Sequence, residues 1–112
     1  MKEIKAIIRQ RQLDAVLDAL HAHRGLPGVT VSYVRGFGRT VGRTESAGSP
    51  VQYGTAEMVK LECVLNDDLL DDVVDMIQGA AHTGQPGDGK MFVYDVEEAV
   101  KIRTGKRSTT LE

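Results

Sequence analysis

The chain has 112 residues, a formal net charge of −2, 41% hydrophobic residues and only 4% aromatic residues. This length predicts one domain, residues 1–112, around a single aliphatic core. The near-neutral charge gives no electrostatic reason to expect nucleic acid or a membrane surface as a partner. The single cysteine, Cys63, excludes an intrachain disulfide. Because no apolar run is long enough to span a membrane and Met1 opens no signal peptide, we expect a cytoplasmic protein.

Apolar periodicity in the first third of the chain predicts a strand, a helix and a second strand. Apolar residues alternate with polar ones from Ile4 to Ile8, which is typical of a strand. Leucine and valine then recur at helical spacing over about residues 12–23, and Gly25 follows as a helix end. The β-branched residues of 29–34 predict the second strand.

The middle of the chain predicts a long loop, a strand and a second amphipathic helix. Residues 38–56 are rich in Gly, Ser and Thr and carry no apolar period. A loop of this length in so small a domain is usually functional. Residues 57–65 alternate as a strand, and Asn66 or Asp67 is expected to cap a helix whose apolar stripe reaches Ile77.

A glycine-dense segment, residues 83–90, leads directly into a predicted strand over residues 91–96. Its three glycines let the backbone turn tightly and approach a ligand closely. Consecutive N–H groups in such a loop form an anion-binding concavity, and Lys90 adds a positive charge. We interpret the segment as a phosphate-binding loop. Residues 96–100 are expected to form a turn before a last basic strand, 101–103.

The order of elements indicates the fold class. Each half of the chain has the same plan of strand, helix, glycine-containing turn and strand. This repetition predicts an α+β fold, the ferredoxin-like split βαβ sandwich (βαββαβ), with both helices on one face of an antiparallel sheet. If the other face is apolar, as its β-branched residues suggest, another subunit must cover it, so we expect an oligomer.

Taken together, these motifs resemble the nitrogen regulatory PII signalling proteins. Residues 1–8 are similar to the first strand of that family, and residues 34–39 to the base of its T-loop. Residues 83–90 resemble its B-loop and 101–105 its C-loop. The resemblance covers nearly the whole chain. It defines a T-loop (38–56), a B-loop (83–90), a C-loop (101–106) and a tail (107–112), whose last two residues, Leu111 and Glu112, carry no weight in the interpretation.

The resemblance implies a homotrimeric signal-transduction protein and no enzyme. ATP or ADP would bind between subunits, with Mg²⁺ as an optional companion. The T-loop would then control a membrane transporter or a metabolic enzyme in nitrogen regulation. The target contacts would come from Thr44, Ser46 and Tyr53. By position, the nucleotide-binding residues would be Ile7, Thr30, Gly36, Phe37, Gly38, Arg39, Val64, Gly87, Asp88, Gly89, Lys90, Lys101 and Arg103.

Two departures from the family pattern argue against the usual 2-oxoglutarate response. Thr40 stands where the family has a glutamine that helps to hold Mg²⁺ and 2-oxoglutarate. Met58 stands where it has a lysine that pairs with the 2-oxoglutarate carboxylate. The usual uridylylated tyrosine motif is also missing around Tyr53. An alternative is therefore a divergent sensor of ADP, AMP or another small anion, with an output outside nitrogen regulation.

Two other function classes remain open at this point. A phosphate-ester hydrolase on the same fold would use the same phosphate loop, yet no paired base, nucleophile or metal cluster stands out in the sequence. The five aspartates of residues 67–75 have the offsets of a solvated helix face. An RNA-binding sheet would need paired aromatic residues, and the chain has only two Phe and three Tyr.

Overall fold

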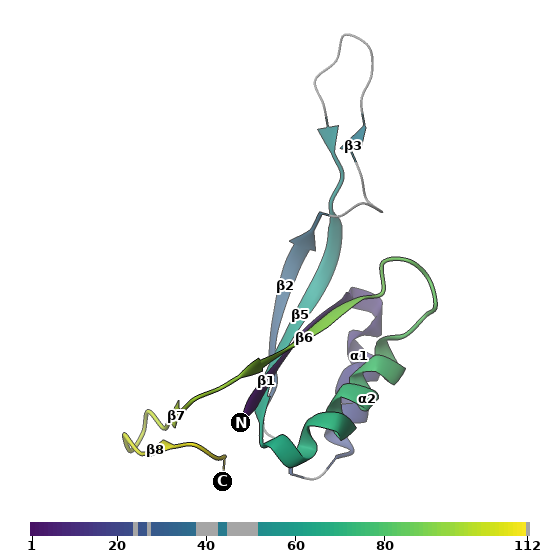
Figure 1. Ribbon diagram of the computed structural model, residues 1–112. Helices are drawn as coiled ribbons and strands as arrows, with labels where there is room; N and C mark the ends of the chain where they lie inside the picture. Colours follow the sequence, from purple (N-terminus) through teal and green to yellow (C-terminus); the bar gives the residue numbers. More distant parts are fainter. Residues whose placement is uncertain (24, 27, 38–42, 45–51, 112) are drawn as a thin grey trace.

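The computed structural model describes the chain except residues 24, 27, 38–42, 45–51 and 112. A four-stranded antiparallel sheet forms its body (Figure 1). The strand order is β2 (Thr30–Gly36), β5 (Ala56–Leu65), β1 (Lys2–Arg9) and β6 (Gly89–Asp95). The first two strands of the chain, β1 and β2, each pair antiparallel with β5, which lies between them in the sheet, so β1 and β2 run parallel to each other. This is the split βαβ arrangement.

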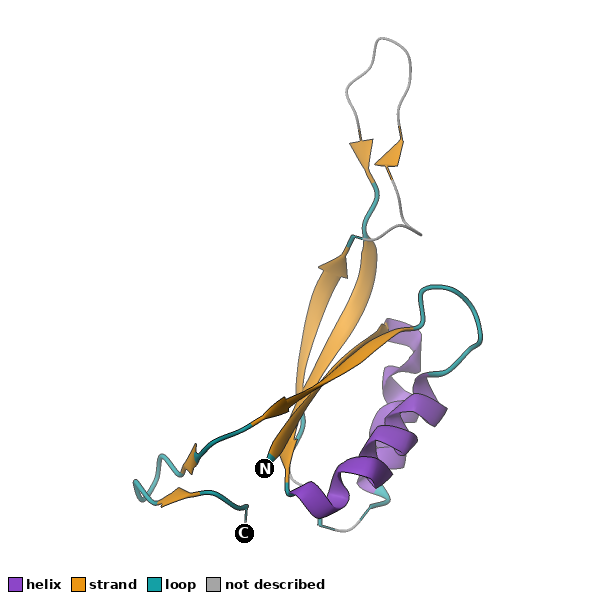
Figure 2. Ribbon diagram, in the orientation of Figure 1, coloured by secondary structure: helices purple, strands orange, loops and turns teal. Residues whose placement is uncertain are grey.

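Both helices cover the same face of the sheet (Figure 2). They are α1 (Leu13–His21) and α2 (Leu70–Ala81), and each follows a short 3-10 helix, η1 (Gln10–Gln12) or η2 (Asp67–Leu69). No helix in the described part of the chain is long and apolar enough to cross a membrane. The predicted ferredoxin-like α+β fold is confirmed. The core between helices and sheet consists of Ile4, Ala6, Ile8, Val16, Leu20, Val59, Leu61, Cys63, Leu65, Val73, Ile77 and Ala81.

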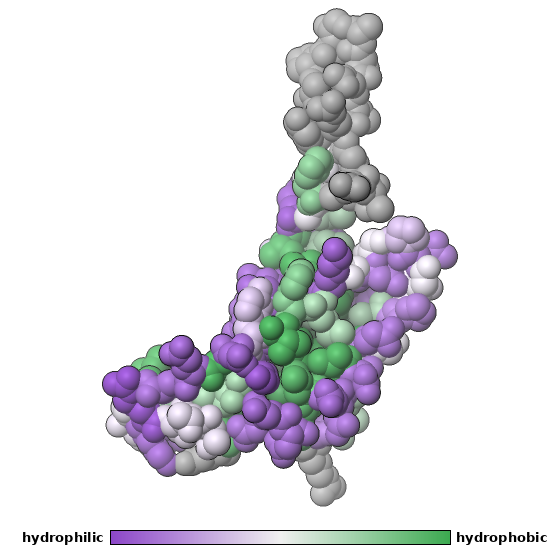
Figure 3. All heavy atoms as spheres, in the orientation of Figure 1, coloured by the Kyte–Doolittle hydropathy of each residue, from purple (hydrophilic) through white to green (hydrophobic). Residues whose placement is uncertain are grey.

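The other face of the sheet is mixed in character and differs from the apolar face expected. Alternation along β1 and β5 places charged residues there, because their neighbours in each strand point into the core. Lys60 Nζ lies 3.4 Å from Glu62 Oε1, and Lys5 Nζ lies 5.1 Å from the centre of the Tyr94 ring. Apolar residues also gather in the middle of the molecule, where β6 crosses the view (Figure 3).

The T-loop contains a short antiparallel ladder that its sequence did not predict. Strands β3 (Arg43–Thr44) and β4 (Gln52–Tyr53) pair with each other beyond the end of the main sheet (Figure 1). Backbone hydrogen bonds between such short segments need no apolar pattern, so periodicity gave no sign of them. The expectation of an irregular loop throughout residues 38–56 is wrong at these four residues and at Ala56, the first residue of β5.

The C-terminal segment also differs from the expectation. Residues 99 and 100, expected in a turn, form β7 (Ala99–Val100), which pairs with β8 (Arg107–Ser108). Residues 101–103 are a turn, and the predicted basic strand is wrong. The carbonyl oxygen of Lys101 accepts hydrogen bonds from the amides of Thr104 (3.3 Å) and Gly105 (2.7 Å). Gly105 closes this turn with a φ of 72°.

Candidate functional site

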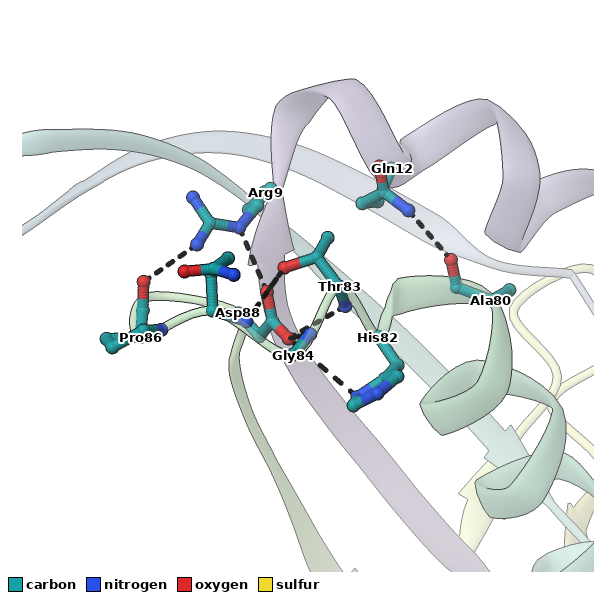
Figure 4. A network of polar contacts seen from close by, with 9 residues as sticks. Arg9, Gln12, Ala80, His82, Thr83, Gly84, Pro86 and Asp88 are labelled. Carbon is teal, nitrogen blue, oxygen red and sulfur yellow. Dashed lines mark hydrogen bonds and ion pairs between the residues drawn. The ribbon is translucent and has the colours of Figure 1, made fainter.

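The B-loop is organised by one carboxylate, that of Asp88 (Figure 4). Asp88 Oδ2 accepts hydrogen bonds from the amides of Thr83 (2.8 Å) and Gly84 (2.9 Å). Asp88 Oδ1 accepts from the Thr83 hydroxyl and from Arg9 Nε, the latter at 3.0 Å. The carboxylate therefore ties the beginning and the end of the loop to each other and to strand β1.

Arg9 is a member of this site that the sequence analysis missed. It ends β1 on the face away from the helices, and its Nη2 donates to the Pro86 carbonyl oxygen at 2.7 Å. A Cβ placed on Gly87 would lie 3.2 Å from the same nitrogen. In the sequence, Arg9 is marked only as a positively charged residue at the last position of an alternating strand. No local sequence pattern relates it to Asp88, which lies 79 residues later in the chain.

The hydrogen bonds that Asp88 accepts, chiefly from the Thr83 hydroxyl, hold the pKa of its carboxyl well below the usual range. The loop is thus built around an ionised carboxylate. His82 ends α2 nearby, with Nδ1 3.9 Å from Asp88 Oδ2. Both carboxylate oxygens of Asp88 are used by hydrogen bonds within the site. The nucleotide contact that the family resemblance implies for Asp88 would therefore have to come from its backbone.

Gly89 joins the B-loop to β6 at a position that no other residue fits. Its φ is 104°, and an added Cβ would lie 1.7 Å from the carbonyl oxygen of Ile7. The next residue, Lys90, pairs with Ile7 across β1 and β6. Because Ile8 points into the core, Ile7 and Lys90 lie on the face without helices. The close approach at Gly89 therefore sets where Lys90 projects.

A groove connects the B-loop to the base of the T-loop, and we call it the B-loop groove. Its walls come from the end of β1, the start of β5 and the loop. Gly36, at the end of β2, lies next to this groove: a Cβ added to it would be 3.8 Å from the side chain of Met58, which lines the groove. The lining residues are Arg9, Gln10, Arg11, Ala56, Glu57, Met58, Pro86 and Gly87.

A second groove lies at the opposite end of β1 and β5, beside the start of the edge strand β2, and we call it the edge groove. It brings together Thr30 and Val64, two of the nucleotide-binding residues that the family resemblance implies, which by that resemblance would line the adenine pocket with Ile7. Ile7 itself is not part of this groove. Thr30 pairs with Glu62 across β2 and β5. The complete lining is Glu3, Gly28, Thr30, Glu62, Cys63, Val64 and Leu111.

The cations Lys101 and Arg103 lie exposed in the C-terminal turn, away from both grooves of the same protomer. Within the described part of the chain, neither they nor Lys90 form an ion pair. The hairpin beneath them is braced by Arg107, whose Nε donates to Glu98 Oε1 at 2.8 Å. Three cations thus remain available for an anion.

Several predicted residues fall outside what the structure describes. Gly38, Arg39, Thr40 and Ser46 lie outside the described residues. Thr44 and Tyr53 are placed in the backbone of β3 and β4. Phe37 follows β2 with 58% of its surface exposed.

The sequence analysis expected three further features, Cys63, the aspartates of residues 67–75 and Asn66, to have structural rather than ligand-binding roles. Cys63 lies in the core, and burial raises the pKa of its thiol. The aspartates of residues 67–75 are exposed, and no group of three or more potential metal ligands occurs among the described residues. Asn66 precedes η2 but makes no side-chain capping bond, so its expected role as a cap is wrong.

Comparison with known proteins places this geometry in a family. A family model described as nitrogen regulatory protein P-II matches residues 1–106. The chain is 48% identical over 108 residues to the nitrogen regulatory protein P-II of Rhodospirillum rubrum, covering 96% of each chain. It is 47% identical to that of Azospirillum brasilense over 108 residues (96% of each chain) and to that of Nostoc punctiforme over 110 residues (97% of each chain).

Replacing Gly89 by alanine tests the close approach between the B-loop and β1. We expect Gly89→Ala to lower the free energy of unfolding by about 1–3 kcal/mol or more, because the new Cβ meets the Ile7 carbonyl at an unfavourable φ. Gly79→Ala is the matched control: it lies in α2 with open space around it, and we expect about 0.5–1 kcal/mol of stabilisation. Urea unfolding measures both. Equal midpoints for Gly89→Ala and the wild type would contradict the geometry.

Asp88→Asn tests the ionised carboxylate. A carboxyl whose pKa is lowered by folding adds stability above its unfolded pKa of about 4, and that stability is lost as the pH falls below it. We therefore expect the variant to melt below the wild type at pH 7, and the gap to shrink as the pH is lowered from about 5 toward 2. Thermal unfolding monitored by circular dichroism across this range is the measurement. A gap that is constant with pH would show that the charge of Asp88 plays no part.

Proposed function

Because the chain belongs to the nitrogen regulatory protein P-II family, we propose that it is a cytoplasmic signalling regulator that binds ATP or ADP between the subunits of a homotrimer. It controls a target transporter or enzyme in nitrogen regulation through its T-loop. The observation that carries the proposal is the B-loop, a glycine-rich loop held by Asp88 that ends in Lys90, which forms no ion pair with any residue that the structure describes. The names of the relatives support the nitrogen-regulatory output.

The phosphates of the nucleotide bind at the B-loop. Gly87 and Gly89 have φ values of 99° and 104°, a backbone conformation that favours glycine and lets the loop turn tightly at both positions. Asp88 is turned into the loop by its hydrogen bonds, which leaves Lys90 as the charge presented outward. A polyphosphate gains about 1.5–3 kcal/mol from each charge-assisted hydrogen bond before desolvation.

The positions of the two grooves support a site between subunits. Thr30 lies on β2 and Lys90 on β6, at opposite edges of the sheet. Three strand spacings separate these edges, about 14 Å, with β5 and β1 between them. In the proposed trimer, the B-loop of one copy meets the edge groove and the C-loop cations of the next. A closed ring of three copies repeats this contact three times.

The T-loop responds because its base shares the B-loop groove. Ala56, the last residue of the T-loop, and Glu57, which follows it, line the groove together with Gly87. Arg35 braces the same base, with Nη1 donating to the Thr55 hydroxyl at 3.3 Å and Nη2 lying 3.6 Å from Glu57 Oε1. A nucleotide that binds two T-loop arrangements with different affinity shifts their populations. The target contacts at Thr44, Ser46 and Tyr53 are part of this proposal.

The B-loop groove also favours a second candidate, a nucleotide sensor without the usual 2-oxoglutarate response. Met58 lines the groove and carries no charge for a carboxylate. The Arg9 guanidinium is held by Asp88 and the Pro86 carbonyl oxygen. The position of Met58 in this groove therefore supplies no charge for a carboxylate, and Arg9 is already engaged, which leaves Arg11 as the other cation that lines the groove. Mg²⁺ remains an optional companion of ATP, carried by its phosphates.

Removing single cations tests the nucleotide site. We expect Lys90→Ala and Arg103→Ala each to weaken ATP binding by about tenfold or more, because each loses a charge-assisted contact. Isothermal titration measures the affinity, and size-exclusion chromatography with light scattering checks that the assembly is unchanged. Lys2→Ala, which removes a cation already paired with Asp95, is the control. Unchanged ATP affinity in both variants would refute the proposed site.

Titration of the ATP-loaded protein with 2-oxoglutarate separates the two candidates. We expect no binding heat and no change in ATP affinity, because Met58 supplies no charge. The double variant Thr40→Gln/Met58→Lys is expected to gain a response at least tenfold above the wild type, since one buried charged contact is worth that much. ATP binding by the wild type that tightens with 2-oxoglutarate and Mg²⁺ would overturn the second candidate.

A further inference from the structure

The side chain of Asn66 holds the C-terminal tail by two hydrogen bonds. Asn66 Nδ2 donates to the Leu111 carbonyl oxygen at 2.9 Å, and the Leu111 amide donates to Asn66 Oδ1 at 2.8 Å. Both bonds are partly buried, and both polar groups of the amide side chain are used. We call this pair the tail clasp. It joins residues 45 positions apart in the chain.

Further hydrogen bonds connect the tail clasp to the C-terminal hairpin that carries the C-loop. Three residues before Leu111, the Ser108 hydroxyl donates to the Thr110 carbonyl oxygen (2.7 Å) and accepts from its amide (3.2 Å). Ser108 belongs to β8, which pairs with β7 and is braced by Arg107 and Glu98. The clasp is thus a second attachment of the C-terminal hairpin to the body, in addition to its covalent link through β6.

Leu111 also takes part in the edge groove. Its half-buried side chain lines this groove with Thr30 and Val64. The same residue lines a neighbouring pocket formed by Val100 and Lys101 of the C-terminal hairpin. Leu111 therefore lies between the edge groove, where the purine ring is proposed to bind, and the C-loop.

We propose that Asn66 is a positioning residue of the nucleotide site, holding Leu111 as an apolar wall for the purine ring and fixing the hairpin that presents Lys101 and Arg103. This inference rests on the nucleotide site proposed above. A purine needs an apolar surface of this kind, and Val64 alone supplies little of it. Because Asn66 makes no capping bond to η2, its side chain is fully committed to the tail.

Hydrogen exchange of the Leu111 amide tests the clasp independently of any ligand. In the ligand-free protein we expect protection of this amide, lost by about tenfold in Asn66→Ala. Asn66→Asp keeps the acceptor oxygen and is expected to retain part of the protection. Asp68→Ala, an exposed neighbour in η2, is the matched control and is expected to leave it unchanged. Equal protection in the wild type and Asn66→Ala would overturn the clasp.

ATP titration of the same variants tests its role in binding. We expect about fivefold weaker binding in Asn66→Ala and in Leu111→Pro, which removes the donor amide. The double variant is expected to bind no more weakly than either single variant, because both break the same contact. Leu111→Ala keeps the clasp and tests the wall: protection stays, and ATP affinity falls about fivefold.

The outcomes separate this inference from the proposed site. Loss of protection in Asn66→Ala with unchanged ATP affinity would leave a purely structural clasp and overturn the positioning role. Additive losses in the double variant would overturn it as well. A wild type that binds no adenine nucleotide would refute the proposed function and, with it, the ligand part of this inference, whereas the exchange result would still decide whether the clasp exists.

Discussion

The ligand-facing side of this protein depends on a single inward-turned carboxylate. Asp88 receives donors from the start of the B-loop and from Arg9 at the end of β1, so the loop cannot move without β1. The same bonds keep the carboxylate ionised and turned into the loop. A loop rich in glycine would otherwise be flexible. Here its shape is imposed by hydrogen bonds, and its glycines serve close approach.

Strand β1 connects this loop to the rest of the fold. It is central in the sheet, and alternation gives its two faces different tasks. Ile4, Ala6 and Ile8 form the core under the helices, while Ile7 and Arg9 face the B-loop side. The register between Ile7 and Lys90 therefore follows from core packing, because a slip by one residue would expose the apolar set. The register of β1 thus determines both which residues are buried in the core and where Lys90 lies.

Sequence reasoning succeeded where the signal is local and periodic. The helices and the four main strands follow from apolar spacing, and the B-loop from its glycines and Lys90. It failed where hydrogen bonds join distant or short segments. The β3–β4 ladder, the turn at Lys101 and the contacts of Arg9 and Asn66 arise from pairings that no local pattern encodes. Basic alternation at Lys101 and Arg103 resembled a strand, but Gly105 favours the turn.

The arrangement of the two grooves links sensing to assembly. On the proposed arrangement each copy supplies a phosphate-binding half at its B-loop and a purine-binding half at its edge groove, which lie at opposite ends of β1 and β5. A nucleotide then binds well only where two copies meet, so it stabilises the assembly by mass action. The mixed sheet face is consistent with this, because charged residues such as Lys60 and Glu62 tolerate water in a way that an apolar face does not. In this proposal the nucleotide adds to the contact between subunits, so binding and assembly are linked.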